Sequence, residues 1–446
     1  MNYVQRIQHK WSHAVQKGYH IDIAAIVIGQ GASTLGSIIG LRLVTEVVRP
    51  EVFGEVKLIL GIIIFLSGVF VTPFCQFVMR RIHDFEGQAR ALFERQSRRY
   101  LGSLLVLLGI FLALGLNIYG FAHGKNYVTA SLAALIILVA GGSIDLERSI
   151  FVSLKQQIFA SVLVILRRWL VPLAVFFVVL LLGDRVSWYL MANAAALVLI
   201  WLAVVRFLKR QNPCGEAVEF VSHDQLSLKA WLRDAMPYVL PLVGVGVLSW
   251  IVNLGDRYIM LRYVSLKDIG IYSACYGLGS MPMTAIGGMV TRFFYPIYFK
   301  KAVINVRADI DRKMVFIAAS VISVLGFVFF LFFVFGGKYI ISLFLGKEYR
   351  YGAFELMMWI VGGYFLLSVT YAFNLFAYAR KRTNFIAIAY GISALSNIIL
   401  NFYLVPKMGI MGAARSTFLT FLIYFMLMLY FFVACKGRNK NEGLYR

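Results

Sequence analysis

The chain has 446 residues, of which 60% are hydrophobic and only 15% are charged. A soluble domain of this composition would expose apolar side chains over its whole surface, so the composition indicates that lipid is the solvent and leaves no room for a soluble catalytic domain. The net charge of +23 would suggest a nucleic-acid partner in a soluble protein. Here the basic residues gather in short connections between apolar runs, so we expect the lipid bilayer, and no nucleic acid, as a partner.

Apolar runs of about twenty residues recur along the whole chain, and this is the length that an α-helix needs to cross a bilayer. We therefore predict an all-α integral membrane protein with about twelve transmembrane helices, both of its termini being cytoplasmic. The predicted spans are residues 21–41, 56–78, 101–122, 128–148, 158–182, 188–205, 236–256, 271–299, 314–335, 357–379, 385–404 and 414–434.

The predicted orientation follows from where the Lys and Arg residues fall. We count Lys57 and Arg148, at the margins of their spans, with the adjoining connections. The connections placed inside then hold 28 of the 44 basic residues and those placed outside hold 12. Such a bias over short loops is the positive-inside pattern. The remaining four basic residues lie within spans: Arg167, Arg168, Arg292 and Arg415.

The chain divides into two predicted lobes of six helices each. A cytoplasmic amphipathic segment at residues 1–20 precedes an N-terminal lobe at 21–205. The polar stretch 206–235 is predicted to be a cytoplasmic linker, and it is followed by a C-terminal lobe at 236–434 and a cytoplasmic tail at 435–446. Six helices per lobe give the two lobes the same orientation, so an internal symmetry axis would run along the membrane normal.

Catalytic and metal-binding patterns are not evident. No connection carries a nucleophile–base pair, a metal cluster or a phosphate-binding glycine-rich loop, so we predict that the protein is not an enzyme and has no cofactor. His9 and His13 share a helical face, but we interpret them as surface residues and not as metal ligands. Two of the four cysteines fall in apolar spans and two in cytoplasmic connections, and we expect no disulfide.

Two predicted spans carry polar stripes together with residues that disfavour helix. Gln30, Thr34 and Ser37 recur at i, i+4 and i+7 in the first span, and Ser249, Asn253 and Asp256 do so in the seventh. The first span holds four glycines, and the seventh holds Pro237, Pro241, Gly244 and Gly246. Paired interruptions at matching places in two lobes indicate a transporter's central cavity. Because Gly36 and Gly40 form a GxxxG pattern, helix packing explains the glycines as well.

The membrane-embedded arginines are candidates for binding an anionic cargo. An arginine in hydrocarbon is unfavourable, so it normally faces a cavity or a partner, although it can also reach the interface, where Trp169 could mark an aromatic belt. Polar and aromatic stripes on two further spans suit either a sugar-lined cavity or hydrogen bonds between helices. They comprise Tyr364, Ser368, Tyr371 and Tyr378 on the tenth span and Ser393, Asn397 and Asn401 on the eleventh.

Short motifs spread along the chain resemble those of Wzx-type oligosaccharide flippases of the multidrug/oligosaccharidyl-lipid/polysaccharide exporter superfamily. The resemblance covers nearly the whole chain in helix number, loop lengths and motif order. The motifs are Arg49-Pro50-Glu51-Val52-Phe53-Gly54, Asp256-Arg257-Tyr258-Ile259-Met260, Gly270-Ile271-Tyr272-Ser273-Ala274, Asn397-Ile398-Ile399-Leu400-Asn401, Pro406-Lys407-Met408-Gly409 and Gly412-Ala413-Ala414.

The resemblance implies a fold like that of the MATE transporters, with a cavity between two bundles that opens alternately to each side. It implies a cargo of oligosaccharide repeat units on undecaprenyl pyrophosphate, carried to the periplasmic leaflet of the bacterial cytoplasmic membrane for O-antigen or exopolysaccharide synthesis. Polysaccharide polymerase machinery would be a partner. The matching Asp256–Arg257 is either a structural pair or a coupling site. The alternatives are a multidrug or cation antiporter of the same fold, and a membrane polysaccharide polymerase or ligase.

Overall fold

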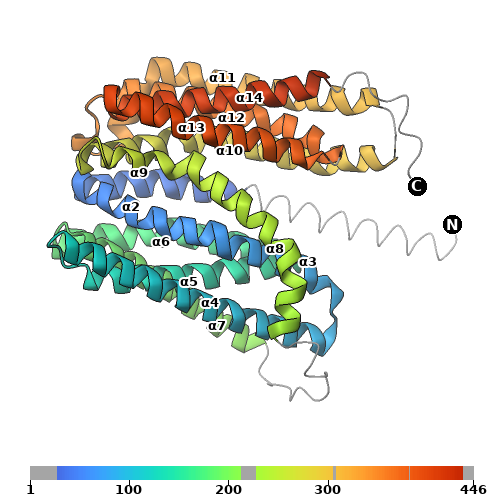
Figure 1. Ribbon diagram of the computed structural model, residues 1–446, viewed down its shortest axis with the longest axis horizontal. Coiled ribbons are helices and arrows are strands. Elements are labelled where there is room, and N and C mark those ends of the chain that lie inside the picture. Colours follow the sequence, from blue (N-terminus) through green and yellow to red (C-terminus); the bar gives the residue numbers. More distant parts are fainter. Residues whose placement is uncertain (1–27, 212–227, 305–307, 381, 435–446) are drawn as a thin grey trace. The chain divides into compact units, whose positions relative to one another are not determined.

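The computed structural model describes residues 28–211, 228–304, 308–380 and 382–434. Within these ranges every regular element is a helix (Figure 1). A first helix covers 28–47. It is followed by α2 (Pro50–Leu66), η1 (Ser67–Val71), α3 (Thr72–Arg81), η2 (Ile82–Asp84), α4 (Gly87–Ala122), α5 (Val128–Ser153), α6 (Gln157–Leu182), α7 (Val186–Gln211), α8 (Leu228–Trp250), η3 (Ile251–Gly255), α9 (Asp256–Met260), α10 (Leu266–Ile304), α11 (Ala308–Phe344), η4 (Lys347–Tyr349), α12 (Ala353–Ala379), α13 (Thr383–Met408) and α14 (Ile410–Ala434).

Each of the twelve predicted spans coincides with helix wherever the chain is described, so the prediction of an all-α membrane protein is confirmed. Ten helical segments in the described residues are long and apolar enough to cross a membrane. The helix at 28–47, whose predicted span begins at residue 21, is not among them, and neither is α10, which is rich in Gly, Ser and Tyr. The predicted amphipathic segment 1–20, most of the predicted linker and the tail at 435–446 lie outside the described residues.

The two glycine- and proline-rich spans differ in whether their helix is interrupted. The backbone is helical throughout 28–47. In the seventh span α8 continues through Pro237 and Pro241, and the π-helical turn η3 then interrupts the span at Ile251–Gly255. A second π-helical turn, η1, lies in the second span. A membrane helix tolerates proline because neighbouring groups can satisfy the backbone atoms that it leaves free.

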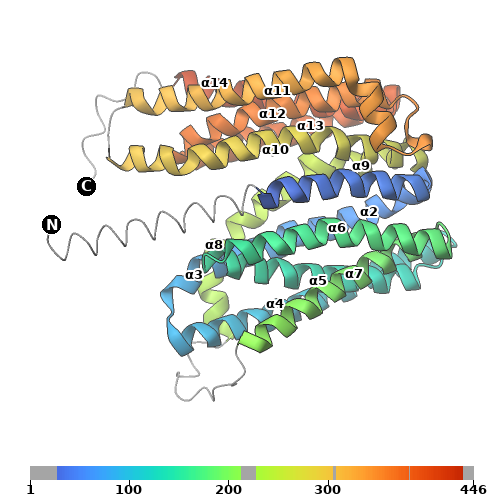
Figure 2. The same ribbon diagram turned by 180° about the vertical axis from the view of Figure 1, so that it is seen from behind.

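The chain forms two compact units. The first comprises Met1–Gly40 and Leu66–Val243. Within it α5 is the central helix, because it contacts α3, α4, α6 and α7, and Figures 1 and 2 show these helices running alongside one another. Small residues in the middle of α5 allow this close approach. They include Ala133, Ala134, Ala140, Gly141 and Gly142, all of them buried.

The second unit comprises Leu41–Phe65 and Gly244–Arg446. Its central helix is α12, which contacts α10, α11, α13 and α14 and is the most buried of the ten apolar spans. Two side-chain donors attach α2 to this unit. Trp250 donates its indole N–H to the Gly61 carbonyl at 2.9 Å, and Tyr258 donates its hydroxyl to the Leu58 carbonyl at 2.7 Å.

Two of the sequence motifs meet where α2 and α10 begin. A Cβ atom at Gly54 would lie 2.1 Å from the Leu266 carbonyl oxygen, and one at Gly270 would lie 1.9 Å from the Pro50 carbonyl oxygen. Cβ atoms do not approach other heavy atoms so closely, so the two backbones can touch only if both positions are glycine. The glycines of these motifs therefore have a packing role within the second unit.

We predict that Gly270→Ala lowers the thermal stability of the purified protein, because overpacking against a backbone atom typically costs about 1–3 kcal/mol. The matched control is Gly115→Ala, a helical glycine of α4 with no atom within 4 Å of the added Cβ. The control should leave the melting temperature unchanged or raise it slightly. Equal melting temperatures for the two variants would contradict the proposed contact.

We predict that cysteine labelling will show the linker at 206–235 and the C-terminal tail to be cytoplasmic. Cys75 and Cys275 are 5% and 0% exposed, so an impermeant thiol reagent should report only Cys214 and Cys435, which lie outside the described residues. Both should react from the cytoplasmic side alone. A cysteine introduced at Gly183 or Lys347 in a background without the native cysteines should react from outside. Periplasmic labelling of Cys214 would overturn the predicted orientation.

Candidate functional site

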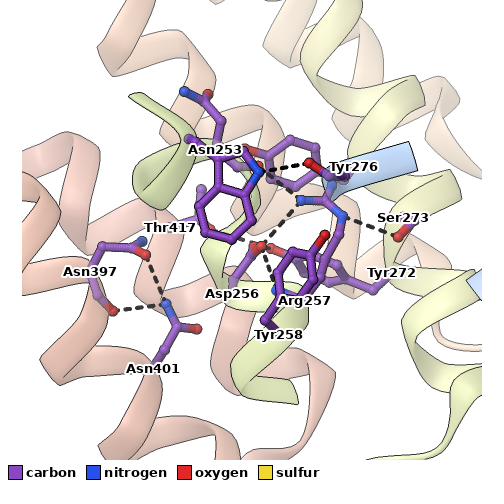
Figure 3. Close-up of polar contacts among 12 residues, drawn as sticks. Asn253, Asp256, Arg257, Tyr258, Tyr272, Ser273, Tyr276, Asn397, Asn401 and Thr417 are labelled. Atoms are coloured by element: carbon purple, nitrogen blue, oxygen red, sulfur yellow. Dashed lines mark hydrogen bonds and ion pairs between the residues drawn. The ribbon is translucent and has the colours of Figure 1, made fainter. Parts of the chain in front are cut away.

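A buried ion pair is the centre of the polar cluster in the second unit. Asp256 and Arg257 begin α9, and their side chains are 1% and 5% exposed (Figure 3). Arg257 Nη1 lies 3.2 Å from Asp256 Oδ1. A buried charge is tolerated only when it is paired and its remaining hydrogen-bonding atoms are satisfied, so the surroundings of this pair decide whether it is stable.

The π-helical turn η3 arranges the backbone around this pair. The backbone N–H of Arg257 donates to Asp256 Oδ1 at 2.8 Å. The Asn253 carbonyl, one helical turn earlier, accepts a hydrogen bond from Arg257 Nη1 at 2.9 Å. The side chains of the pair are therefore hydrogen-bonded to the backbone of η3 and α9 as well as to each other.

Side chains from α10 complete the environment of the pair. Tyr272 donates its hydroxyl to Asp256 Oδ2, and Arg257 Nε donates to Ser273 Oγ at 3.2 Å. The guanidinium group also lies over the ring of Tyr276, 4.5 Å from its centroid, which is a favourable cation–π distance. Both carboxylate oxygens and two guanidinium nitrogens therefore have partners within the second unit.

A chain of polar groups continues from this cluster. Tyr364 of α12 donates to the Tyr276 hydroxyl at 2.6 Å and to Asn253 Oδ1 at 3.4 Å. Asn253 Nδ2 donates to the Tyr390 hydroxyl at 3.4 Å.

Asn397 donates to Thr420 Oγ1 at 3.1 Å on the neighbouring helix. Four of the sequence candidates, namely Asn253, Asp256, Arg257 and Tyr364, therefore belong to one hydrogen-bonded cluster, whereas Asn397 bonds to α14 and Tyr371 is half-buried against Gly287.

This geometry favours the structural interpretation of Asp256–Arg257. The two side chains bind different partners, so exchanging the residues would separate Tyr272 from its acceptor and Ser273 from its donor. Exchanging the two residues is therefore not expected to restore a structural pair in this environment. A role in coupling remains a proposal.

In the first unit, two arginines pair with carboxylates of α5. Arg98 of α4 binds Glu147 through two hydrogen bonds of 2.6 and 3.0 Å and also contacts Glu94 at 3.1 Å. Arg167 of α6 makes a single hydrogen bond with the part of the chain that the structure describes, to Asp145 Oδ1 at 3.1 Å. Its neighbour Arg168 is exposed and makes no hydrogen bond or ion pair with the described residues.

The polar stripe of the first helix is arranged differently. Thr34 donates its hydroxyl to the Gln30 carbonyl at 2.8 Å, which is a bond within one helix. Trp169 donates its indole N–H to the Ala32 carbonyl at 3.0 Å and lies against Gly36, where a Cβ atom would be 2.6 Å from the indole nitrogen. Gly40 similarly faces Pro172. Gly36 and Gly40 are thus packing positions, and Trp169 packs against a neighbouring helix of its own unit.

The other two embedded arginines lie in the second unit. Arg292 of α10 is exposed. Arg415 of α14 is half-buried, with its guanidinium 5.2 Å from the Trp359 ring centroid and Nη1 3.4 Å from Met408 Sδ. Its Nε is buried without a hydrogen-bond partner among the described residues. Arg415 is therefore held mainly by packing and cation–π contact.

A hollow of about 470 Å³ lies in the first unit, between the end of α3 and the first half of α8. Its lining includes Arg80, which lies over the Tyr238 ring at 5.3 Å. Arg81, beside it, forms ion pairs with Asp84 at 2.7 Å and Asp234 at 2.6 Å. The charges of this hollow therefore cancel, and they indicate no particular ligand.

Sequence reasoning did not identify the residues that form hydrogen bonds with Arg257 and Arg167. Tyr272 and Ser273 appeared only as part of a motif. Arg257 and Ser273 are 16 positions apart, and Arg167 and Asp145 are 22 positions apart. Helical periodicity relates positions within one helix, so it gives no signal for such pairs between helices.

Comparison with known proteins identifies the class of this one. The profile of a family described as "Polysaccharide biosynthesis protein" matches residues 21–302, which is more than half of the chain. The chain belongs to this family. Among curated proteins, none matches the chain.

Solved structures of transporters share the fold. The structure described as "Lipid II flippase MurJ, inward closed conformation" aligns with a TM-score of 0.68 and 14% identity, over 90% of this chain and 86% of that one. An inward-facing multidrug resistance MATE family transporter of the MOP superfamily gives a TM-score of 0.68 and 13% identity, over 91% and 96%. The MATE multidrug transporter DinF-BH gives 0.59 and 15%, over 94% and 96%. The predicted MATE-like fold is confirmed.

We predict that Asp256→Ala destabilises the protein by about 3–5 kcal/mol, because it leaves the buried guanidinium of Arg257 without its counter-ion. The control is Glu46→Ala, which removes the carboxylate of the exposed Arg42–Glu46 pair and should change stability by less than about 1 kcal/mol. Thermal unfolding of both purified variants measures the difference. Wild-type stability of Asp256→Ala would show that the pair does not hold this part of the second unit together.

Proposed function

We propose that this protein is a flippase for lipid-linked oligosaccharides. Its cargo would be an oligosaccharide repeat unit on undecaprenyl pyrophosphate, moved by alternating access from the cytoplasmic to the periplasmic leaflet of the bacterial cytoplasmic membrane. The product would serve the synthesis of a cell-surface polysaccharide such as O-antigen or exopolysaccharide, and polysaccharide polymerase machinery would consume it. Membership of a polysaccharide biosynthesis family and a fold shared with a lipid II flippase support this proposal.

The observation that carries the proposal is a pair of accessible arginines inside a membrane-spanning helix. Arg167 and Arg168 lie ten and eleven residues after the start of α6, so they are roughly 15 Å into the helix at 1.5 Å per residue. The Arg167 side chain is 39% exposed, and Arg168 is exposed as well. Guanidinium groups at such depth are tolerated when they face water or an anion. Pyrophosphate is the anionic part of the proposed cargo.

The carboxylates favour this cargo over the cation or drug alternative. Asp145, Glu147 and Asp256 lie in helical segments that can span the membrane, and each is paired with an arginine. A transporter of cations would use such carboxylates to bind its cargo, and here arginines occupy them. The connection between Phe344 and Ala353 is too short for the periplasmic domain of a polymerase or ligase.

The roles of the remaining sequence candidates follow from this proposal. Arg292 and Arg415 would supply further positive charge, and Gln30, Thr34 and Tyr371 would line the path of the glycan. The lobes at 21–205 and 236–434, joined by the cytoplasmic linker at 206–235, would move against each other, and α2 would move with the C-terminal lobe, because it belongs to the second compact unit.

The proposal is tested in a strain that lacks the gene. Lipid-linked repeat units should accumulate in the cytoplasmic leaflet, where an intact membrane protects them from a membrane-impermeant sugar-modifying reagent added from outside. Complementation with variants should then rank the substitutions at position 167 by the transport that they retain. Arg167→Lys should retain part of the transport, Arg167→Ala should lose at least about tenfold, and Arg167→Glu should abolish transport, because paired guanidinium donors bind phosphate best.

The amount of correctly inserted protein is measured in the same cells, so that transport is expressed per molecule. The same series is made at Arg168 and Arg292, and Arg185, which precedes α7, serves as the exposed control. Unpolymerised units in the outer leaflet of the deletion strain would contradict a flippase and indicate a polymerase. Full transport per molecule with alanine at all three positions would contradict the cationic binding site.

A further inference from the structure

Arg167 is paired with Asp145 through a single carboxylate oxygen. The two atoms, Nη1 and Oδ1, are 3.1 Å apart, and the side chains are 39% and 37% exposed. The Arg167 guanidinium makes no other hydrogen bond with the described residues, so its remaining N–H donors are available. Gly141 of α5 has no side chain at this point, and Arg167 Nη2 lies 3.4 Å from where a Cβ atom would stand.

Arg98, in the same unit, is an arginine with more carboxylate partners. Its guanidinium binds both oxygens of Glu147, which is 7% exposed, and a third oxygen from Glu94. A bidentate pair with a buried carboxylate joins α4 to α5 firmly. Arg167 joins α6 to the same helix α5 by one hydrogen bond at an accessible site, so its attachment is weaker and open to competition.

The charges around Arg167 leave an excess of positive charge. Arg148 of α5 and Arg168 of α6 are both exposed, and Arg168 interacts electrostatically with Arg148, Asp145 and Arg167. Three guanidinium groups and one carboxylate give this group of side chains a formal charge of +2. A pyrophosphate diester carries two negative charges, so the group can compensate it fully.

We infer that Asp145 is a resident counter-ion of Arg167, and that the pyrophosphate of the cargo displaces it. This inference rests on the proposed function and assigns a positioning role to a residue outside the candidate binding residues. Before the cargo binds, Asp145 holds the Arg167 guanidinium over α5. When the pyrophosphate binds, its oxygens take the N–H donors of Arg167, and Asp145 turns to the exposed guanidinium of Arg148 or Arg168.

The exchange explains why an accessible cationic site carries a carboxylate at all. Without Asp145 the site would hold pyrophosphate more tightly, and a cargo that binds too tightly leaves slowly. A carboxylate that returns to Arg167 favours release, because it compensates the guanidinium as the cargo departs. Arg167 and Asp145 each have a partner of opposite charge at both stages, and this keeps the pair tolerable within a membrane-spanning region.

The test measures binding of farnesyl pyrophosphate and of inorganic pyrophosphate to the purified full-length protein in phosphatidylcholine nanodiscs. Isothermal titration gives Kd for wild type, Asp145→Asn, Arg167→Gln and the double variant. Asp145→Asn should bind both probes about tenfold more tightly, because a hydrogen bond to a charged group typically contributes about 1.5–3 kcal/mol and 1.4 kcal/mol is tenfold in affinity. Arg167→Gln should bind at least tenfold more weakly, and the double variant should match Arg167→Gln.

Glu94→Gln is the matched control, since it removes a carboxylate of the same unit that contacts Arg98 and leaves Arg98 paired with Glu147. It should leave both Kd values unchanged. Weaker or unchanged binding by Asp145→Asn would overturn the inference, and so would an equal gain by Glu94→Gln. A gain that persists without Arg167, or that appears only with the farnesyl probe, would overturn it as well.

The outcome for Asp145 can be separated from the outcome for the flippase. The titration uses neither a glycan nor transport, so the predicted pattern of Kd values can hold even if the deletion strain shows no accumulation in the cytoplasmic leaflet. In that case the flippase proposal fails and the counter-ion exchange stands. Accumulation in the strain together with unchanged binding by Asp145→Asn gives the opposite result.

Discussion

A charged group inside a membrane must have a partner or water, and this constraint decides where the polar residues of this protein lie. An unpaired ion in hydrocarbon is too unfavourable to persist, so each interior carboxylate of the described residues faces a guanidinium group. Asp256 meets Arg257, Glu147 meets Arg98, and Asp145 meets Arg167. The helices must approach one another in the positions that make these pairs possible.

Each unit achieves that approach around one central helix. In the first unit α5 carries small buried residues, and it also carries the carboxylates that pair with Arg98 of α4 and Arg167 of α6. In the second unit α12 is the most buried apolar span, and its Tyr364 extends the polar cluster around Arg257. In each unit the closely packed central helix therefore also contributes polar side chains, which belong to the charge pairs themselves in α5 and to the hydrogen-bonded cluster around the pair in α12.

The pairs differ in how completely they are satisfied, and this difference separates structural from functional roles. Arg257 and Arg98 each form several hydrogen bonds, and they join helices within their units. Arg167 has one partner and accessible donors, and Arg168 beside it is exposed. A guanidinium with several partners can bind a cargo only after several hydrogen bonds are lost. Arg167 can bind one after it exchanges a single hydrogen bond.

The sequence by itself determined that the protein is a helical membrane protein and where its spans lie, because apolar runs long enough to cross a bilayer are a local property of the chain. It also marked Arg167 and Arg168 as exceptional, because arginine in such a run is unfavourable whatever surrounds it. The tertiary structure alone decided that Asp256–Arg257 is enclosed by Tyr272 and Ser273, that Trp169 packs against Gly36, and that Arg167 holds Asp145 by one oxygen. These contacts join helices that are separate in the chain, and only the packing of the helices brings their side chains within hydrogen-bonding distance.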